Sequence, residues 1–427
     1  MKLGVFTLGC KVNLYESEIM MNAFKSKGYE ICNFEDICDV YIINTCTVTN
    51  NADSKCRKII NKARSMNQDA VICVVGCYSQ VSSDEIKEKL NVDIILGTKD
   101  KTLLPNYVAE FLKEKKQISN IYDIREAEFE DMTIFNLESR TRAFIKIQDG
   151  CNNFCSYCII PYARGGVRSK DKNILLKEII ELTKKGYKEI VLTGIHTGGY
   201  GQDLDNYSFS DLLEDIFKNK KLKRLRISSI EVTELDNKFF EILKNEPRLV
   251  NHLHIPIQSG SNNVLKLMNR KYTLKEYFSI IEKIRTIRPK IAISTDLIIG
   301  HPGETEENFK EVVDTLEKIK FSKVHIFPYS KRKNTKAFYM KNHIDGNIKK
   351  NRIKQVSALS KILEIEYMNK FLNEELEVLV EKCENKICTG HTSNYILVKF
   401  EGEYNSNDLV KVNLKKVNYP IIEGKVI

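Results

Sequence analysis

One short stretch, CNNFCSYC at residues 151–158, organises the whole chain. Its three cysteines, Cys151, Cys155 and Cys158, follow a C-x3-C-x2-C spacing in a loop entered through Asp149-Gly150. A loop of this length can wrap three thiolates around one inorganic centre. An ordinary iron–sulfur cluster is closed by four thiolates, so a cluster held here would keep one iron open. The alternatives are three buried thiols or a zinc knuckle that lacks one ligand.

The composition describes a globular protein without membrane segments. Hydrophobic residues make up 42% of the 427 residues and charged residues 29%, a balance typical of soluble proteins. No apolar run is long enough to span a bilayer, and the run from Leu3 to Leu8 is too short for a signal peptide. We therefore expect no membrane partner and a cytoplasmic location, where thiols stay reduced. In that compartment, 12 cysteines indicate metal or redox chemistry.

The first part of the chain, up to about residue 135, alternates strand and helix patterns. Apolar runs predict strands at 3–8, 40–43, 70–75 and 94–96. Helical spacing predicts a helix at 13–28, a second helix that follows the second strand and ends near residue 66, and a further helix near 101–116. Asn13 is the expected cap of the first helix and Gly28 its stop. Strands that alternate with helices predict a parallel sheet with helices on both faces.

Three cysteines of this part, Cys10, Cys46 and Cys77, each follow the end of a predicted strand. The carboxyl ends of parallel strands are where such sheets bind ligands, so the three side chains can converge on one point. We interpret them as ligands of a second cluster. The alternative is that cysteine is common in buried strands, as Cys73 within its own strand illustrates. The remaining cysteines of this part match no such position and are interpreted as structural: Cys32, Cys38 and Cys56.

The central part predicts six strands separated by helices. The strands are expected at 144–147, 190–193, 225–228, 252–255, 291–298 and 324–327, and the helices at 174–185, 208–218, 233–244, 262–286 (two helices) and 304–319. Six such units predict a partial barrel rather than the closed eight-fold form. The cysteine loop follows the first strand and therefore lies at the carboxyl-terminal mouth, where barrel enzymes keep their chemistry.

Small or polar residues follow the other strands of this barrel. The segment 194–201 holds four glycines, which let a backbone approach a ligand closely. Polar residues at several strand ends around one cysteine loop predict a cofactor pocket, although turn chemistry and helix capping, as at Thr305, are the alternative. The candidate cofactor contacts are Gly194, Ser229, Glu231, Gln258 and Asp296.

A C-x3-C-x2-C loop after the first strand of a six-unit partial barrel resembles the radical S-adenosylmethionine superfamily. The resemblance implies a [4Fe–4S] cluster on Cys151, Cys155 and Cys158, whose open iron chelates the amino and carboxylate groups of S-adenosylmethionine. Reduction would cleave the cofactor to a 5′-deoxyadenosyl radical that removes a hydrogen from the substrate. The cofactor carries the hard chemistry, and the protein supplies position and the exclusion of water.

The N-terminal cysteine trio narrows the resemblance to the methylthiotransferases, over nearly the whole chain. NTCTVTN at 44–50, IQDGC at 147–151 and TGIH at 193–196 are most similar to the enzymes that act on N6-threonylcarbamoyladenosine in tRNA, the MtaB type. Two positions depart from that pattern: Gly166 stands where proline is expected, and Glu16 stands where aspartate is common.

The resemblance implies insertion of a methylthio group at C2 of the adenosine 3′ of the anticodon. A second [4Fe–4S] cluster, on Cys10, Cys46 and Cys77, would carry the sulfur at its open iron. One S-adenosylmethionine would supply the methyl group and another the radical. The implied partners are tRNA, a low-potential electron donor and a sulfur donor. No catalytic residue is expected beyond the cluster ligands.

The last part changes pattern. A helix is expected over 345–375, followed by short strands at 377–380, 395–400 and 409–413 and near the end of the chain. They predict a small antiparallel barrel of oligonucleotide-binding character, which resembles the TRAM domain of this family. Tyr395 could stack on a base, and no metal is assigned to Cys383 and Cys388. Six lysines could face phosphates: Lys382, Lys386, Lys399, Lys411, Lys415 and Lys416.

The expected domain organisation is a methylthiotransferase domain at 1–135, a radical S-adenosylmethionine barrel at 136–370 and a TRAM domain at 371–427. The net charge of +10 is compatible with a tRNA partner, but a solvated lysine-rich surface gives the same value. Three alternatives stay open. Two are methylthiolation of isopentenyladenosine in tRNA and methylthiolation of an aspartate of a ribosomal protein. The third is an iron–sulfur RNA-binding protein without catalysis.

Overall fold

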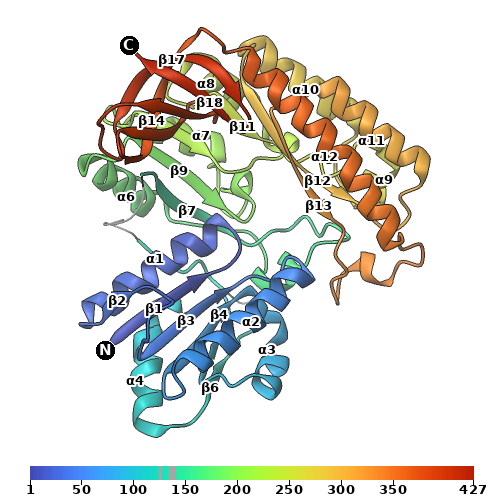
Figure 1. The fold of residues 1–427 in the computed structure, drawn as a ribbon. Helices are drawn as coiled ribbons and strands as arrows, with labels where there is room; N and C mark the ends of the chain where they lie inside the picture. The colour runs from blue at the N-terminus through green and yellow to red at the C-terminus, as the bar shows by residue number, and fades with distance from the viewer. Residues whose placement is uncertain (125–126, 134–140) are drawn as a thin grey trace.

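The computed structural model describes residues 1–124, 127–133 and 141–427. The chain is an α/β protein in which an N-terminal sheet, a central barrel-like set of strands and a small C-terminal barrel follow one another (Figure 1). The fold class expected from the sequence is confirmed. The expected boundary between residues 135 and 136 lies outside the described residues. Across the described ranges, no helix has the length and apolar character needed to cross a membrane.

The N-terminal sheet has six parallel strands in the order β2-β1-β3-β4-β5-β6. Residues of β3 alternate between two apolar clusters, Val40 and Ile42 in one and Tyr41 and Ile43 in the other, because helices cover both faces. The strands are β1 Lys2–Thr7, β2 Glu30–Cys32, β3 Val40–Thr45, β4 Val71–Gly76, β5 Ile94–Leu96 and β6 Ile118–Asn120. The helices are α1 Lys11–Ser26, α2 Asn50–Met66, α3 Cys77–Lys89, η1 Lys101–Leu103 and α4 Leu104–Glu114.

The prediction that Asn13 caps the first helix is wrong. α1 begins at Lys11 with Cys10 at its N-cap, and Asn13 lies inside the helix. Its side-chain amide instead donates to the carbonyl oxygens of Leu8 (2.6 Å) and Thr45 (3.0 Å), which follow β1 and end β3. Asn13 therefore fixes the two strand ends that carry Cys10 and Cys46. The three-residue edge strands β2 and β6 are too short to give a sequence pattern of their own.

The central part forms two neighbouring sheets, β10-β9-β7-β8 and β11-β12-β13, which a bridge between Leu225 and Leu249 brings together. All six predicted strands are present and pair in parallel, which makes a partial barrel, while the extra strand β8 is antiparallel to β7. Thr305 caps α11 as expected, since its hydroxyl accepts from the amide of Asn308 (3.2 Å).

The elements of this part have the following bounds. The strands are β7 Ala143–Asp149, β8 Arg168–Ser169, β9 Glu189–Gly194, β10 Arg224–Ile227, β11 His252–His254, β12 Ala292–Ile299 and β13 Lys323–Pro328. The helices are α5 Ile160–Arg164, α6 Lys172–Lys184, η3 Thr197–Gly199, α7 Phe209–Phe217, η4 Val232–Glu234, α8 Asn237–Asn245, α9 Asn262–Leu267, α10 Leu274–Ile287 and α11 Glu306–Ile319.

The two faces of the barrel strands differ in polarity. Leu192, Leu225, Leu253 and Ile293 belong to the large apolar core that the surrounding helices cover. Successive side chains of a strand point to opposite faces, so their neighbours along each strand face the barrel interior. Those neighbours are largely polar, and they include Thr193, Arg226, His254, Ser294 and Asp296. The interior of this barrel is therefore not an apolar core.

The C-terminal part begins with η5 and the long helix α12 and ends in a closed five-stranded barrel of order β14-β15-β16-β18-β17. The predicted small antiparallel barrel is confirmed: every neighbouring pair is antiparallel except β16 and β18, which run parallel. The bounds are η5 Lys336–Tyr339, α12 Gly346–Asn369, β14 Glu375–Glu384, β15 Ile387–Thr392, β16 Leu397–Glu401, β17 Leu409–Asn418 and β18 Ile421–Val426.

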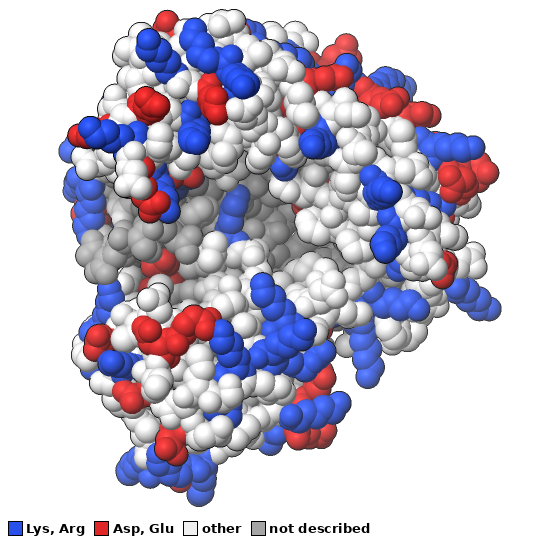
Figure 2. Space-filling view, viewed as in Figure 1, with Lys and Arg blue, Asp and Glu red and all other residues white. Residues whose placement is uncertain are grey.

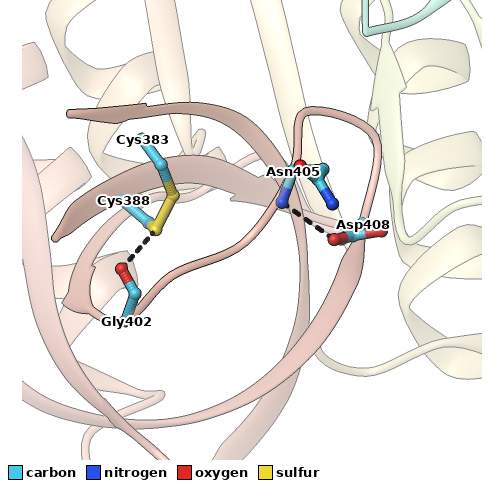
Figure 3. The surroundings of a disulfide bond; sticks show 5 residues. All are labelled: Cys383, Cys388, Gly402, Asn405 and Asp408. Carbon is cyan, nitrogen blue, oxygen red and sulfur yellow. Dashed lines mark hydrogen bonds between the residues drawn. A yellow bond between two sulfur atoms is a disulfide. The ribbon is translucent and has the colours of Figure 1, made fainter.

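Cys383 and Cys388 form a disulfide, contrary to the expectation that the thiols stay reduced (Figure 3). The two residues are register partners on β14 and β15. The hairpin between them turns at Asn385 and Lys386, which both have positive φ (51° and 65°). This two-residue turn brings the two cysteines face to face, which sequence spacing alone does not reveal.

The C-terminal barrel packs on the amino-terminal ends of the central strands. Tyr395 stacks with His252 and with His391 at centroid distances of 5.1 and 4.7 Å, and the guanidinium of Arg226 lies 4.5 Å from its ring centroid. The amide of Asn251 donates to the hydroxyl of Ser393 (2.8 Å). Tyr395 is therefore engaged with protein groups, which disfavours the prediction that it stacks on a base. The six lysines are all exposed.

Candidate functional site

The loop with the three central cysteines leaves β7 and folds back on the turn that follows α5. The amide of Cys151 donates to the carbonyl of Gly165 (3.0 Å), and the amide of Cys158 donates to that of Cys155 (3.0 Å). Gly150 has φ +74°, and a Cβ there would lie 1.7 Å from the carbonyl oxygen of Gly166. Only glycine allows this approach, so Gly150 fixes how the loop leaves the strand.

A buried guanidinium compensates negative charge at this loop. Arg270 donates to Sγ of Cys155 (3.3 Å) and pairs with Glu231 (2.8 Å). Burial, and then the neighbouring Cys155, raise the pKa of the Cys158 thiol to about 12. Burial likewise raises the pKa of Cys155, which lies next to the Arg270 cation, and a thiolate formed there on binding of a metal cluster would be stabilised by Arg270.

His196 adds a second charged contact to the loop. It pairs with Glu234, and its Nε2 lies 3.3 Å from the side-chain amide of Asn153. Burial opposes protonation of His196, but hydrogen bonding to Cys151 and Glu234 raises its pKa to about 11. The imidazolium is thus a further positive group beside the cysteine loop.

The N-terminal cysteines lie together at the carboxyl ends of β1, β3 and β4, as the sheet topology predicts. Cys46 is buried, and burial followed by the neighbouring Cys77 and Cys10 raises the pKa of its thiol to about 12. Gly9 has φ +104°, and a Cβ there would lie 2.7 Å from Cβ of Cys46. Glycine at this position lets the loops of Cys10 and Cys46 approach each other.

Among the described residues, no group of three or more His, Cys, Asp or Glu side chains is close enough to hold a single metal ion. A [4Fe–4S] cluster is larger than one ion and requires its three sulfurs to stand farther apart. Three all-cysteine donors in each trio match the soft ligands that iron–sulfur clusters use. The donor chemistry therefore fits a cluster better than it fits a single zinc ion.

Arg164 connects the two cysteine trios. It is fully buried, its Nε donates to Sγ of Cys77 (3.2 Å), and one Nη donates to Oδ1 of Asn13 (2.8 Å). The other Nη pairs with Glu16 (2.8 Å) and Asp149 (3.0 Å). Arg164 ends the helix that follows the central cysteine loop, so one side chain ties that loop to the N-terminal sheet.

Two lysines complete this buried network around Glu16. Lys101 and Lys146 both pair with Glu16, and Lys146 also pairs with Asp149 (2.6 Å). Burial opposes ionisation of Glu16, but Arg164, Lys101 and Lys146 hold the pKa of its carboxyl well below the usual range. The departure from aspartate at Glu16 therefore supplies the longer side chain that reaches three cations.

A second buried arginine holds the loop of Cys46 from the opposite side. Arg332, which follows β13, donates to Asn50 (2.7 Å), to Asp53 (2.7 Å) and to the hydroxyl of Thr47. The amide of Asn50 donates to the hydroxyl of Ser330 (3.0 Å). The segment NTCTVTN is thus fixed against the barrel mouth by side chains from the end of the barrel.

The five predicted cofactor contacts are placed around the same mouth. Ser229 is partly exposed, and Gly194 closes β9 against Gln148, where a Cβ would meet Oε1 at 3.0 Å. Glu231 caps η4 and pairs with Arg270. The last two, Gln258 and Asp296, contact each other, and Asp296 also contacts a histidine. Gln258 has φ +62° and donates its amide to the carbonyl of Asp296 (2.9 Å), and Asp296 pairs with His254 (3.3 Å).

Lys11, next to Cys10, was not singled out in the sequence. It is mostly buried, and neither a hydrogen bond nor an ion pair joins its side chain to any residue in the described ranges. Burial, then Arg226 and Arg142, lowers the pKa of Lys11 to about 8, while Glu189 and Asp296 oppose the shift. These neighbours belong to the barrel or precede it, so Lys11 reaches from the N-terminal part toward the barrel interior.

Two regions of the chain match known protein families, and nearly the whole chain is similar to characterised enzymes. Residues 145–316 match the radical SAM superfamily, and residues 2–97 match the uncharacterized protein family UPF0004. The threonylcarbamoyladenosine tRNA methylthiotransferase MtaB of Bacillus subtilis (strain 168) is 45% identical over 429 residues, which cover 99% of this chain and 95% of that protein. A tRNA-2-methylthio-N(6)-dimethylallyladenosine synthase of Clostridium tetani is 35% identical, over 99% of this chain and 95% of that protein.

A solved structure of the radical S-adenosylmethionine methyltransferase TsrM from Kitasatospora setae has the same fold. It aligns with a TM-score of 0.59 at 14% identity, over 79% of this chain and 77% of that chain. The cysteine loop, the partial barrel and the superfamily match define a radical S-adenosylmethionine protein, a class that uses a [4Fe–4S] cluster and S-adenosylmethionine. Within that class, the chain belongs to the MtaB-type threonylcarbamoyladenosine tRNA methylthiotransferase family.

Proposed function

We propose that this enzyme methylthiolates C2 of N6-threonylcarbamoyladenosine, the adenosine 3′ of the anticodon in tRNA. The observation that carries the proposal is the 45% identity to the Bacillus subtilis enzyme over nearly the whole of both chains. The two cysteine trios, joined by Arg164, supply what radical methylthiolation needs. The lower identity of the dimethylallyladenosine synthase favours threonylcarbamoyladenosine over isopentenyladenosine.

The two trios have different roles in this proposal. Cys151, Cys155 and Cys158 hold the cluster that, with S-adenosylmethionine bound, generates the 5′-deoxyadenosyl radical. Cys10, Cys46 and Cys77 hold a second [4Fe–4S] cluster, which supplies the sulfur. Arg270 and His196 balance charge at the first trio and Arg164 at the second. The chain accordingly divides into a methylthiotransferase domain, a radical barrel and a tail, with boundaries near 135 and 370.

The polar mouth of the barrel would hold S-adenosylmethionine. Gly194 and Ser229 lie at the ends of β9 and β10, where a backbone or hydroxyl can meet the cofactor. Glu231, held by Arg270, lies beside the cysteine loop. Gln258 and Asp296 approach from β11 and β12. The same proposal includes a low-potential electron donor, a sulfur donor, and a tRNA bound in part by the exposed lysines of the tail.

The proposal is tested by mass spectrometry of nucleosides from tRNA of cells with and without this protein. A methylthio form of threonylcarbamoyladenosine is expected only when the protein is present. If isopentenyladenosine gains the group instead, the reaction is right and the substrate is wrong. If no tRNA nucleoside changes, the tRNA substrate itself is refuted, and ribosomal proteins become the material to examine.

The division of labour between the trios gives a separate prediction. Cys46→Ala should leave the cleavage of S-adenosylmethionine intact but stop methylthio formation, because only the second trio loses a ligand. The measurement follows 5′-deoxyadenosine and methylthio nucleoside in one reduced reaction. Cys32→Ala, on the edge strand of the same sheet, is the matched control and should retain both products. Methylthio product from the Cys46 variant would show that the assigned roles are wrong.

A further inference from the structure

The inner face of β11, β12 and β13 carries a connected group of polar side chains. The hydroxyl of Ser294 lies 2.9 Å from a ring nitrogen of His252 and 2.9 Å from one of His254. The other ring nitrogen of His254 lies 3.3 Å from Asp296. Asp296 is the register partner of His325 on β13, whose ring centroid is 5.7 Å from that of His254. His254, Asp296 and His325 thus form one wall of the barrel interior.

This wall is accessible. His325 is exposed and the side chain of Asp296 is 31% exposed, although both lie on strands whose other face is buried. β13 is the last strand of its sheet, and a groove of about 360 Å³ lies between its edge and α12, lined by His325, Phe327, Ser357 and Glu364 among others. Figure 2 shows the molecule hollowed between the N-terminal part and the parts above it, with both acidic and basic side chains along the lower rim.

Lys11 approaches the same interior from the N-terminal part. Its charged neighbours are the cations Arg226 and Arg142 and the carboxylates Glu189 and Asp296. Arg226 pairs with Glu189, and Arg142 pairs with both Glu189 and Glu381, whereas Lys11 forms no ion pair with any of the described residues. Arg226 also has one buried Nη without a hydrogen-bond partner. A carboxylate from a ligand would give Lys11 the partner that it lacks among these residues.

We infer that Lys11 and His325, with His254 oriented by Asp296, form a subsite that binds the threonylcarbamoyl group of the substrate nucleoside. The ammonium of Lys11 and the ring of His325 bind the threonine carboxylate. His254 accepts or donates a hydrogen bond at the hydroxyl or the urea of the same group. The inference rests on the proposed function and names the residues that would select this nucleoside.

The chemistry of the wall explains how selection would work. An isopentenyl group carries no polar atom, so its entry would bury Lys11 and His325 without a hydrogen-bond partner from the substrate. Each unpaired buried polar group costs about 1–3 kcal/mol, and more when it is charged. A site built to hydrogen-bond a substrate group can reject an analogue that lacks it by roughly 10⁴-fold or more. Polar walls of this kind therefore discriminate strongly between the two nucleosides.

The test compares anticodon stem-loops that carry threonylcarbamoyladenosine or isopentenyladenosine, using the reconstituted full-length enzyme. Lys11→Gln and His325→Gln are each expected to lower kcat/KM for the threonylcarbamoyl substrate by at least about tenfold, mainly through KM, and to shift the ratio between the two substrates toward isopentenyl. Lys323→Gln is the matched control, because Lys323 lies on the same strand but pairs with Glu364 (2.7 Å). Its substrate ratio should stay at the wild-type value.

A modified substrate tests the contribution of the threonine carboxylate by itself. When the threonine carboxylate is replaced by a carboxamide, the wild type should lose affinity, while Lys11→Gln should lose little more than it already has. The substitution at Lys11 and the change of carboxylate to carboxamide form a double-mutant cycle. Its interaction energy reports the contact between Lys11 and the carboxylate only if cluster assembly is unchanged, so iron content and 5′-deoxyadenosine formation are measured in parallel. His325→Gln, distant in sequence from every cysteine ligand, guards against damage near Cys10.

The outcomes separate the two proposals. An unchanged substrate ratio in both variants, with normal iron content, would overturn the subsite while the wild-type reaction stands. Absence of methylthio product from the wild type on the threonylcarbamoyl stem-loop would overturn the proposed function itself, and the subsite with it. A wild-type enzyme that prefers the isopentenyl stem-loop would likewise refute both.

Discussion

Replacement of Cys155 by alanine is expected to abolish reductive cleavage of S-adenosylmethionine. The substitution removes one of three cluster ligands and leaves Arg270 without the sulfur to which it donates (3.3 Å). Three thiolates are already one fewer than an ordinary cluster uses, so the loop has no spare ligand. The guanidinium and Glu231 would remain paired (2.8 Å), which keeps the mouth folded while the cluster is lost.

The measurement combines iron content, the electron paramagnetic resonance signal of the reduced protein and release of 5′-deoxyadenosine. The variant should keep the iron and the signal of the N-terminal trio and should release no 5′-deoxyadenosine. Cys73→Ala is an informative control, because Cys73 is buried within β4 and should affect stability without affecting the clusters. Release of 5′-deoxyadenosine by the Cys155 variant at the wild-type rate would refute the assignment of the radical site to this loop.

Replacement of Arg164 by glutamine is expected to destabilise the protein by about 3–5 kcal/mol, the usual cost of removing one partner from a buried ion network. Arg164, Glu16 and Asp149 are all nearly inaccessible to water. Without the guanidinium, Glu16 and Cys77 of the N-terminal part and Asp149 of the barrel lose the donor that they share. The two cysteine trios would then no longer be held in a fixed position relative to each other.

Urea unfolding followed by circular dichroism measures the loss. The variants Arg164→Gln, Glu16→Gln and the double variant form a cycle whose interaction energy should differ from zero, because the two residues contact each other directly. Lys184→Gln is the surface control, since its pair with Glu181 is exposed and contributes at most about 1 kcal/mol. A single Arg164 variant as stable as the wild type would show that the network does not join the two parts.

The sequence predicts the cysteine trios and most strands because their signals are local or periodic. The C-x3-C-x2-C spacing needs no tertiary information, and three cysteines at the ends of parallel strands converge by topology alone. Arg164 could not be assigned in this way. Its partners Glu16 and Cys77 lie 148 and 87 positions away in the chain, and no pattern around Arg164 distinguishes it from a surface arginine.

The wrong prediction for Asn13 and the disfavoured prediction for Tyr395 have similar causes. Asn13 has the residue type of a cap, but its side-chain amide donates instead to the nearby carbonyl of Leu8 and to the distant carbonyl of Thr45. Tyr395 has the type of a stacking platform, but its partners are imidazoles from β11 and β15. In both cases the residue type is right for the chemistry and the partner is set by tertiary structure, which overrides local preference.

The packing of Tyr395 against His252 has a consequence for synthesis of the chain. The floor of the central barrel is supplied by a loop that is synthesised only after all the strands of that barrel. Until then, Arg226 and His252, both nearly buried in the finished protein, face solvent. A chain that stops before the tail would therefore have a central barrel with an open, charged base. We expect cellular quality control to treat it as a misfolded protein, not as an enzyme that lacks one domain.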